Sequence, residues 1–230
     1  MALTSPHPAD GEPKTLVDKA YADIKRRILD NEFPTGFSAM EPELALSLGI
    51  SRTPLREALV RLQGEGLVEV IPRRGMRVLP VSADQMAQIY QVVTALESLA
   101  LELIAARKPS ENDLQPLIDA TDRMEKSLQA NDLRAWALAD EDFHRNMVEL
   151  AGNEVLLHEI MRHWDRTHRA RMVTLHLRPA PVNSTREHME MVDALRKGDV
   201  DLAVTTNRKH RARGNSELTR ILSSLPGRSF

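Results

Sequence analysis

Apolar residues recur at helical spacing through the first part of the chain and predict three short helices. In "LVDKAYADIKRRIL" the apolar positions 16, 17, 20, 21, 24 and 28 fall on one face of a helix. "EPELALSLG" predicts a second helix, which Gly49 ends, and "SRTPLREALVRLQGEG" predicts a third. The third helix carries a leucine-rich stripe that we expect to be buried, formed by Leu55, Ala58, Leu59 and Leu62.

The pattern then changes to two short extended runs. "LVEVIPRRGMRVLP" predicts strands over residues 67–71 and 76–79, joined by a turn at 73–75. Two helices around a glycine turn, followed by a two-stranded wing, are the layout of a winged helix-turn-helix. We therefore expect that domain over residues 14–80, preceded by a disordered, Pro-rich tail over residues 1–13.

From Ser82 onward the apolar spacing is helical throughout. It predicts helices over about 82–107, 109–130, 132–152, 153–177, 184–198 and 199–225. Ser184 with Glu187 has the spacing of a capping box, which places the start of the fifth of these helices. After a short connector near Pro80–Ala83 we expect an antiparallel bundle of six to seven helices over residues 84–225, and a fold class that is mainly α.

Composition agrees with packed helices and limits the chemistry. Hydrophobic residues make up 42% of the chain but aromatic residues only 3%, so the core is expected to consist of Leu, Ala, Val and Met. Cysteine is absent, so any metal ion must be held by histidine and carboxylate. We find no secretion signal and no run of eighteen apolar residues, which predicts a cytoplasmic protein without membrane contact.

The formal net charge of −2 hides a basic region in the predicted winged domain. Residues 51–77 contain six arginines against three glutamates, which suggests one element that faces nucleic acid on a near-neutral protein. Arg52 and Arg56 are four residues apart, so both project from one face at the start of the third helix. An arginine there can hold guanine O6 and N7 together, worth roughly 1–3 kcal/mol of discrimination.

The predicted wing supplies the other candidate DNA contacts. Arg73 and Arg74 at its tip would reach backbone phosphate or the minor groove, with Gly75 letting the turn come close. The alternative is that these arginines form an ordinary solvated face. The helix–turn–helix–wing order in which they stand favours DNA binding.

"LALSLGISRTPLREALVRLQGEGLVEV" resembles the DNA-binding head of GntR-type transcription regulators, and the match covers most of residues 16–79. The resemblance implies operator contacts by Arg52, Thr53, Arg56, Arg74 and Gly75. The chain departs from the family at position 42, where a proline stands in place of an arginine that often also touches DNA.

The candidate chemistry of the helical region rests on its histidines. In "ADEDFHRNM" Asp140 and His144 lie one turn apart and can face a single ion, while His188 and His210 stand on two later helices. One carboxylate and three imidazoles suit Zn, Ni, Mn or Fe, with one or more positions left for water or ligand. An aspartate and histidine at this spacing also occur on plain charged helix faces, so the pair alone leaves both interpretations open.

Two stretches, "DEDFHRNMVELAGN" and "EHMEMVDALRKGDVDLAVTTNRKH", are similar to the FadR-like effector domain of the FCD type that often follows GntR heads. The resemblance covers roughly residues 84–222 and implies that Asp140, His144, His188 and His210 are metal ligands. Family members that lack these ligands bind acyl-CoA instead, so the intact set argues against a fatty-acyl sensor.

A second departure from the family concerns an effector contact. Val93 stands where the family commonly has an arginine. If that arginine pairs with an effector carboxylate in the family, this protein uses either another cation or a different effector. Arg171 is the candidate effector-binding residue and Arg169 a further one; the alternative is that both are solvated helix charges. The other histidines of this region are expected to share one helix without converging on an ion: 158, 163, 168 and 176.

We therefore expect a homodimeric, ligand-responsive transcription regulator, a repressor rather than an enzyme. Two heads would read a palindromic operator, and a small carboxylate bound at the metal would change the spacing of the heads. One alternative is a sensor without metal. Another is a metalloenzyme that activates water, but Glu141 and Asp142 point away from the direction of Asp140 and offer no general base, and Asp142 is expected to be solvated.

Overall fold

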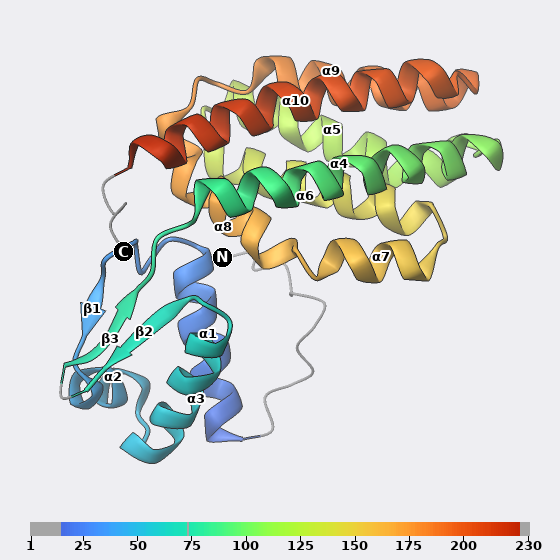
Figure 1. Ribbon diagram of the computed structural model, residues 1–230. Coiled ribbons are helices and arrows are strands. Elements are labelled where there is room, and N and C mark those ends of the chain that lie inside the picture. Colours follow the sequence, from blue (N-terminus) through green and yellow to red (C-terminus); the bar gives the residue numbers. More distant parts are fainter. Residues whose placement is uncertain (1–14, 73, 226–230) are drawn as a thin grey trace. The chain divides into compact units, whose positions relative to one another are not determined.

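The computed structural model describes residues 15–72 and 74–225, and the chain divides between Pro80 and Val81 into two compact units (Figure 1). The N-terminal unit is called the head and the unit from Val81 onward the helical unit. The tail predicted over residues 1–13 lies outside the described residues.

The head contains three helices and a small sheet. In chain order its elements are α1 (Leu16–Leu29), β1 (Ser38–Ala39), α2 (Glu41–Leu48), α3 (Arg52–Gly64), β2 (Val68–Ile71) and β3 (Gly75–Val78). The sheet is antiparallel in the order β1-β3-β2, with Ala39 opposite Met76 and Val70 opposite Met76 on the other side. The sequence missed β1, because two residues are too short to show an alternating pattern.

The core of the head forms where α1 and α3 pack against each other and against the sheet. The stripe predicted on α3 is confirmed, since each of its four residues is at most 1% exposed. Ile24 and Ile28 of α1 are fully buried beside it. Gly49 ends α2 in the left-handed conformation, with φ at +66°, which favours glycine and lets the chain turn sharply into α3.

The described part of the helical unit contains seven α-helices, so the mainly α fold is confirmed. They are α4 (Ala83–Ala106), α5 (Glu111–Gln129), α6 (Leu133–Leu150), α7 (Glu154–Met161), α8 (Trp164–Thr174), α9 (Val182–Lys197) and α10 (Val200–Ser224), with the 3-10 turn η1 (Leu175–Leu177) after α8. α4 packs against α10, α10 against α9, and α5 against both α6 and α9. Figure 1 shows these long helices lying side by side as a bundle.

One helix predicted over about 153–177 is wrong, because the chain breaks at Arg162 and His163 into α7 and α8. Leu156 on α7 and Met172 on α8 are both buried, at 3% and 6% exposure. On one straight helix their side chains would point about 160° apart. The break lets both segments turn an apolar face to the core.

The capping box predicted at Ser184 is also wrong. α9 begins two residues earlier, after Pro181, whose ring restricts φ to values that suit a helix start. Ser184 Oγ instead accepts a hydrogen bond from Arg213 on α10 at 3.1 Å, and Glu187 pairs with Arg213 and His210. Both polar side chains therefore serve the contact between α9 and α10.

Within the described residues, one helix, α4, is long and apolar enough to cross a membrane. Half of its apolar stretch is buried inside the helical unit, as expected of the core helix of a bundle. Its length and composition are thus accounted for by packing.

Candidate metal centre and DNA-binding head

The four candidate metal ligands come together inside the helical unit. α6 supplies Asp140 and His144, α9 supplies His188 and α10 supplies His210. One potential ligand atom from each lies within 4.8 Å of all the others, and none of the four residues is more than 6% exposed.

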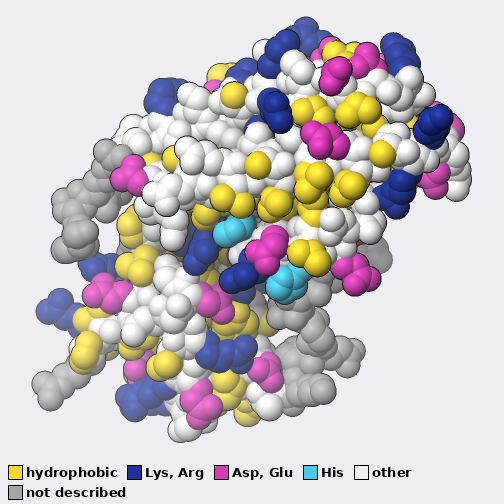
Figure 2. Space-filling model, turned by 45° about the vertical axis from the view of Figure 1, so that its right-hand side comes forward, with side chains coloured by type: hydrophobic (Ala, Val, Ile, Leu, Met, Phe, Trp, Pro, Cys, Tyr) yellow, Lys and Arg dark blue, Asp and Glu magenta, His cyan; other side chains and the backbone are white. Residues whose placement is uncertain are grey.

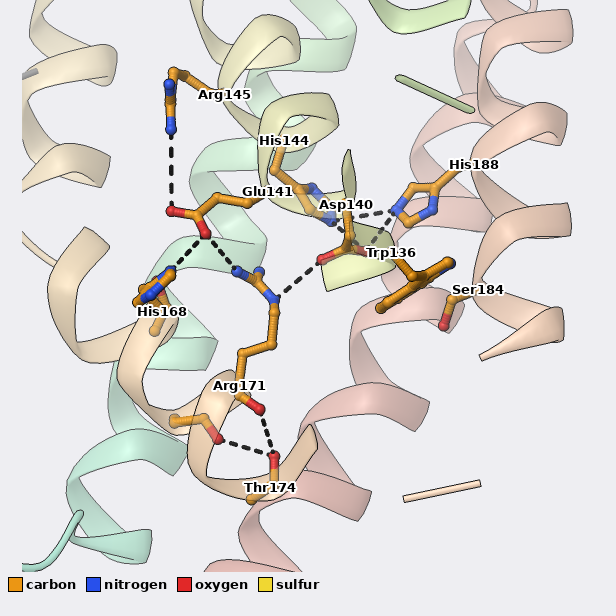
Figure 3. Close-up of polar contacts among 12 residues, drawn as sticks. Trp136, Asp140, Glu141, His144, Arg145, His168, Arg171, Thr174, Ser184 and His188 are labelled. Atoms are coloured by element: carbon orange, nitrogen blue, oxygen red, sulfur yellow. Dashed lines mark hydrogen bonds and ion pairs between the residues drawn. The ribbon is translucent and has the colours of Figure 1, made fainter. Parts of the chain in front are cut away.

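The spacing of these atoms resembles that around a small cation. His188 Nε2 lies 3.2 Å from His144 Nε2 and 3.6 Å from Asp140 Oδ1 (Figure 3). Bonds of 2.0–2.1 Å in a tetrahedral zinc site put neighbouring ligand atoms ~3.4 Å apart. The residues present therefore fit a divalent metal ion, and burial of four such groups together is otherwise costly.

Two carboxylates lie beside the outer ring nitrogens of two of the three histidines. His144 Nδ1 lies 3.2 Å from Oε1 of Glu97 on α4, and His210 Nδ1 lies 2.9 Å from Oε2 of Glu187 on α9. Metal-bound histidines typically donate their second ring nitrogen to such an acceptor, which leaves the other nitrogen for the ion. The arrangement thus presents Nε2 of both histidines to the centre.

These carboxylates are held ionised by arginines of α10. Glu97 is 1% exposed and binds Arg211 through both oxygens; burial alone raises its pKa, but Arg211 and His144 outweigh that and hold the pKa well below its usual range. For Glu187, burial likewise raises the pKa, and His210 and Arg213 lower it to about 2. Both groups are therefore anions that can accept from a histidine N–H.

The sequence reasoning missed Glu97 and Glu187. Glu97 does carry a signal, because it occupies the same helix face as the buried residues Val93, Leu101 and Ile104. A glutamate in the middle of a buried stripe needs a charged partner. Its partner, Arg211, is 114 residues away, which no local pattern reveals.

Asp140 is held in place by Arg171. Arg171 Nε lies 3.1 Å from Asp140 Oδ2, and Arg171 Nη1 lies 3.5 Å from Glu141 Oε2, which also contacts His168 Nδ1 at 2.6 Å (Figure 3). Burial raises the pKa of Asp140, but Arg171 and the three histidines hold it well below its usual range. The aspartate is thus a carboxylate with one oxygen toward the histidines.

The interpretation of Arg169 and Arg171 as solvated helix charges is wrong. Arg169 is 4% exposed, and the Arg171 side chain is 11% exposed between two carboxylates. Asp142 is half-buried rather than fully solvated: it pairs with Arg123 at 2.9 Å.

The remaining histidines of this region stand apart from the cluster. His158 lies on α7, His163 precedes α8, His168 lies on α8 and His176 in η1, so they do not share one helix as predicted. Within the described residues, the group able to hold a metal does not include them.

A pocket reaches the cluster. It is partly open to solvent, and Asp140 and His210 are among its lining residues. Three arginines also line it: Arg171, Arg178 and Arg211. A metal ion at the cluster would therefore have a neighbouring space for a small anionic molecule.

Val93, which stands in place of the family arginine, offers no such cation. It is 4% exposed and packs in an apolar cluster with Ala170 and Leu218. The positive charges of the pocket come instead from α8, from the segment after η1 and from α10.

In the head, the candidate DNA contacts on α3 lie at its exposed N-terminal end. Arg52, Thr53 and Arg56 are all exposed, and the Arg56 side chain is 65% exposed while its Nε lies 2.8 Å from Oε2 of Glu41. Glu41 on α2 is a partner that the sequence did not suggest. This ion pair links Arg56 of α3 to α2.

The turn between β2 and β3 carries the other candidates. Arg74 is exposed, and Arg73 lies outside the described residues. Gly75 has φ at +81°, and a Cβ there would lie 2.0 Å from the carbonyl oxygen of Ala39. The close approach of β1 thus requires glycine at this position, independently of any contact between the turn and DNA.

Comparisons with known proteins match both units. Residues 16–78 match the model of bacterial regulatory proteins of the gntR family, and residues 88–213 match the FCD domain. A HTH-type transcriptional regulator of Agrobacterium vitis, in the TAR-I ttuE-ttuC′ intergenic region, is 42% identical over 59% of this chain and 80% of its own length. Another, of Streptomyces ambofaciens, is 31% identical over 90% of this chain and 86% of its own.

The fold has a solved counterpart. The structure of McbR/YncC from E. coli covers 90% of this chain and 98% of its own at a TM-score of 0.72 and 20% identity, a likeness of fold alone. The family matches and the two relatives, which are named as transcriptional regulators, show that this chain belongs to the GntR family of DNA-binding transcription regulators, with an FCD domain as its helical unit.

Proposed function

We propose that the helical unit senses a small carboxylate through a divalent metal ion and thereby controls the affinity of the heads for operator DNA. The observation that carries the proposal is the pocket: two of its lining residues, Asp140 and His210, belong to the metal cluster, and arginines line it as well. A small anion bound in this pocket would lie beside both the ion and these positive charges.

Asp140, His144, His188 and His210 would hold the ion, with Zn, Ni, Mn and Fe as the candidates for this donor set. When bound, the ion would offer an open position to a carboxylate oxygen. Three further residues would position these ligands: Glu97 and Glu187 orient two histidines, and Arg171 orients Asp140. Arg171 also lines the pocket, so it remains the proposed contact of the effector carboxylate.

The functional unit is proposed to be a homodimer that pairs through α4. Figure 2 shows hydrophobic side chains gathered on one face of the helical unit, and Val92 and Leu99 of α4 are 48% and 40% exposed. They lie seven residues apart, on one side of a long apolar helix. A second copy, presenting the same stripe, would cover it by two-fold symmetry.

Two heads in such a dimer would contact two half-sites of a palindrome. The proposed DNA contacts are Arg52, Thr53, Arg56, Arg73, Arg74 and Gly75. A dimer seated on its operator excludes other proteins from that DNA, so we propose repression. Coupling of about 1–3 kcal/mol between effector and DNA would change operator affinity 5–150-fold. Action on DNA also implies a cytoplasmic location.

The experiment has two stages. Protein purified without chelators is reconstituted and analysed for metal; about one equivalent per chain is expected, and less than one per two chains would count against the site. A binding sequence is then selected from random DNA, and fluorescence anisotropy measures its affinity with metabolite carboxylates, with and without EDTA. Release of DNA by a carboxylate only in the metal-loaded protein supports the proposal.

The alternatives give different results. A sensor without metal would respond to the same carboxylate after EDTA treatment. An enzyme would turn the carboxylate over, but the nearby carboxylates are engaged: Glu141 with His168 and Arg171, and Asp142 with Arg123. A general base for water is therefore not provided by these two residues.

A further inference from the structure

The pocket beside the metal cluster contains a second set of polar groups that the cluster does not use. Tyr90 on α4 lines it and is 3% exposed, yet its hydroxyl group has no hydrogen-bond partner among the described residues. Arg178, just after η1, also lines it, and its buried Nε likewise lacks a partner in the described part of the chain. Buried donors without acceptors are uncommon and costly.

The three arginines of the pocket differ in whether a carboxylate pairs with them. Arg211 binds both oxygens of Glu97, and Arg171 contacts Asp140 and Glu141. Within the described residues, Arg178 has no carboxylate within ion-pair distance. Burial lowers the pKa of Arg178, and the charge of Arg171 lowers it further. Asp140 and Glu217 raise that pKa, but neither lies within ion-pair distance of Arg178. Arg178 therefore brings to the pocket a positive charge that has no direct carboxylate partner among the described residues.

We propose that Tyr90 and Arg178 form a second anion subsite, so that the effector is a short dicarboxylate with one carboxylate at the metal and the other at this pair. A guanidinium and a phenol hydroxyl together donate to a carboxylate, and a buried charge-assisted hydrogen bond is stronger than a neutral one. The subsite deepens the proposed function, on which it rests for the first carboxylate.

Charge also favours this class of ligand. Three arginines line the pocket, and a metal ion at the cluster would add further positive charge beside it. A monocarboxylate would occupy the metal position and leave Arg178 without a carboxylate at ion-pair distance. A dicarboxylate would bind both the metal position and Arg178. Its second carboxylate would therefore raise affinity and favour dicarboxylates over monocarboxylates.

The test is isothermal titration of the metal-loaded full chain with dicarboxylates of three to six carbons, each beside the monocarboxylate in which a methyl group replaces the distal carboxylate. Malate and 2-hydroxybutyrate are one such pair. At least one dicarboxylate is expected to bind tenfold or more tightly than its counterpart. Equal affinities within every pair would overturn the subsite.

Variants test whether Arg178 and Tyr90 cause the preference for dicarboxylates. Arg178→Met is expected to lower dicarboxylate affinity by about tenfold or more, and Tyr90→Phe by a smaller factor, with monocarboxylate affinity and metal content unchanged. Arg208→Met, an exposed arginine of α10 that does not line the pocket, is the matched control. If Arg178→Met leaves the preference intact, the assignment is wrong.

Thermal melts distinguish a ligand-binding role of Arg178 from a structural one. A structural role predicts that Arg178→Met melts at lower temperature without ligand. Removal of a partly buried charge that has no ion-pair partner among the described residues should leave the melting temperature the same or raise it. Metal-dependent carboxylate binding without any dicarboxylate preference would overturn the subsite and leave the proposed function standing. Arg178-dependent binding that persists in EDTA would support the subsite and overturn the proposed metal-dependent function.

Discussion

Arg171 Nε lies 3.1 Å from Asp140 Oδ2, so the carboxylate that faces three histidines is held from behind by an arginine. Replacement Arg171→Met should lower metal affinity by roughly 10–100-fold, the usual effect of losing a group that orients a ligand. Competition with a metal-sensitive dye measures the change. Arg166→Met, an exposed arginine of the same helix, should leave the affinity unaltered. Parent-like metal affinity in Arg171→Met would show that Arg171 does not position Asp140.

Metal removal should destabilise the helical unit. An ion bound only by the folded state adds about 2.7 kcal/mol when its concentration is 100 times Kd, so EDTA should lower the melting temperature by several degrees. His188→Ala should abolish the difference between the melts with and without EDTA. His158→Ala, whose side chain is 75% exposed, should retain it. A shift that survives in His188→Ala would place the metal elsewhere.

The pair of Glu97 and Arg211 should matter more for stability than any surface ion pair. Glu97 is buried and the Arg211 side chain is only 11% exposed, so Glu97→Gln leaves the guanidinium without its counter-charge, which typically costs 3–5 kcal/mol. Glu111→Gln removes an exposed partner of Arg196 and should cost at most about 1 kcal/mol. Urea unfolding measures both. Similar losses in the two variants would contradict the buried role of Glu97.

The sequence was sufficient to predict those metal ligands whose arrangement follows from helical spacing. Asp140 and His144 are one turn apart, and the distances between their side chains and His188 agree with one shared centre. The roles of Glu97 and Glu187 could not be predicted, because the position of Glu97 shows only that it needs a charged partner and Glu187 has the spacing of a helix cap. Their importance comes from contacts across the bundle, which spacing within one helix does not encode.

The same limit explains the errors in the fold. The apolar pattern over about 153–177 is compatible with one helix, and only the need to bury both Leu156 and Met172 shows that it must break. Ser184 has the spacing of a cap but bonds to Arg213 on another helix. In the head, by contrast, the apolar stripe on α3 predicted the buried residues correctly, because one short helix packs through one face.

DNA binding should depend on the exposed start of α3. The double variant Arg52→Ala/Arg56→Ala should lose sequence-specific binding, since two arginines that can reach base edges are removed while the buried face of α3 is untouched. Anisotropy with the selected operator measures the loss, and the elution volume of the protein reports whether it stays folded and dimeric. Lys19→Ala, an exposed basic residue of α1, should bind nearly as the parent does. Undiminished specific binding by the double variant would refute this interface.

Gly75 should be needed for the head to fold, independently of DNA. Its φ of +81° and the 2.0 Å separation between an added Cβ and the carbonyl oxygen of Ala39 mean that Gly75→Ala must displace backbone of β1. We expect a loss of about 2 kcal/mol or more in the head and no change in the helical unit.

Gly64 is the matched control, because it lies within α3 and a Cβ there meets nothing within 4 Å. Gly64→Ala should stabilise the head by roughly 0.5–1 kcal/mol, since alanine is the better helix former. Calorimetry or limited proteolysis, which follow the two units separately, measures both changes. The two substitutions add the same methyl group, so opposite signs would assign the effect of Gly75 to its backbone position. A Gly75→Ala head as stable as the parent would mean that β1 need not pair with β3.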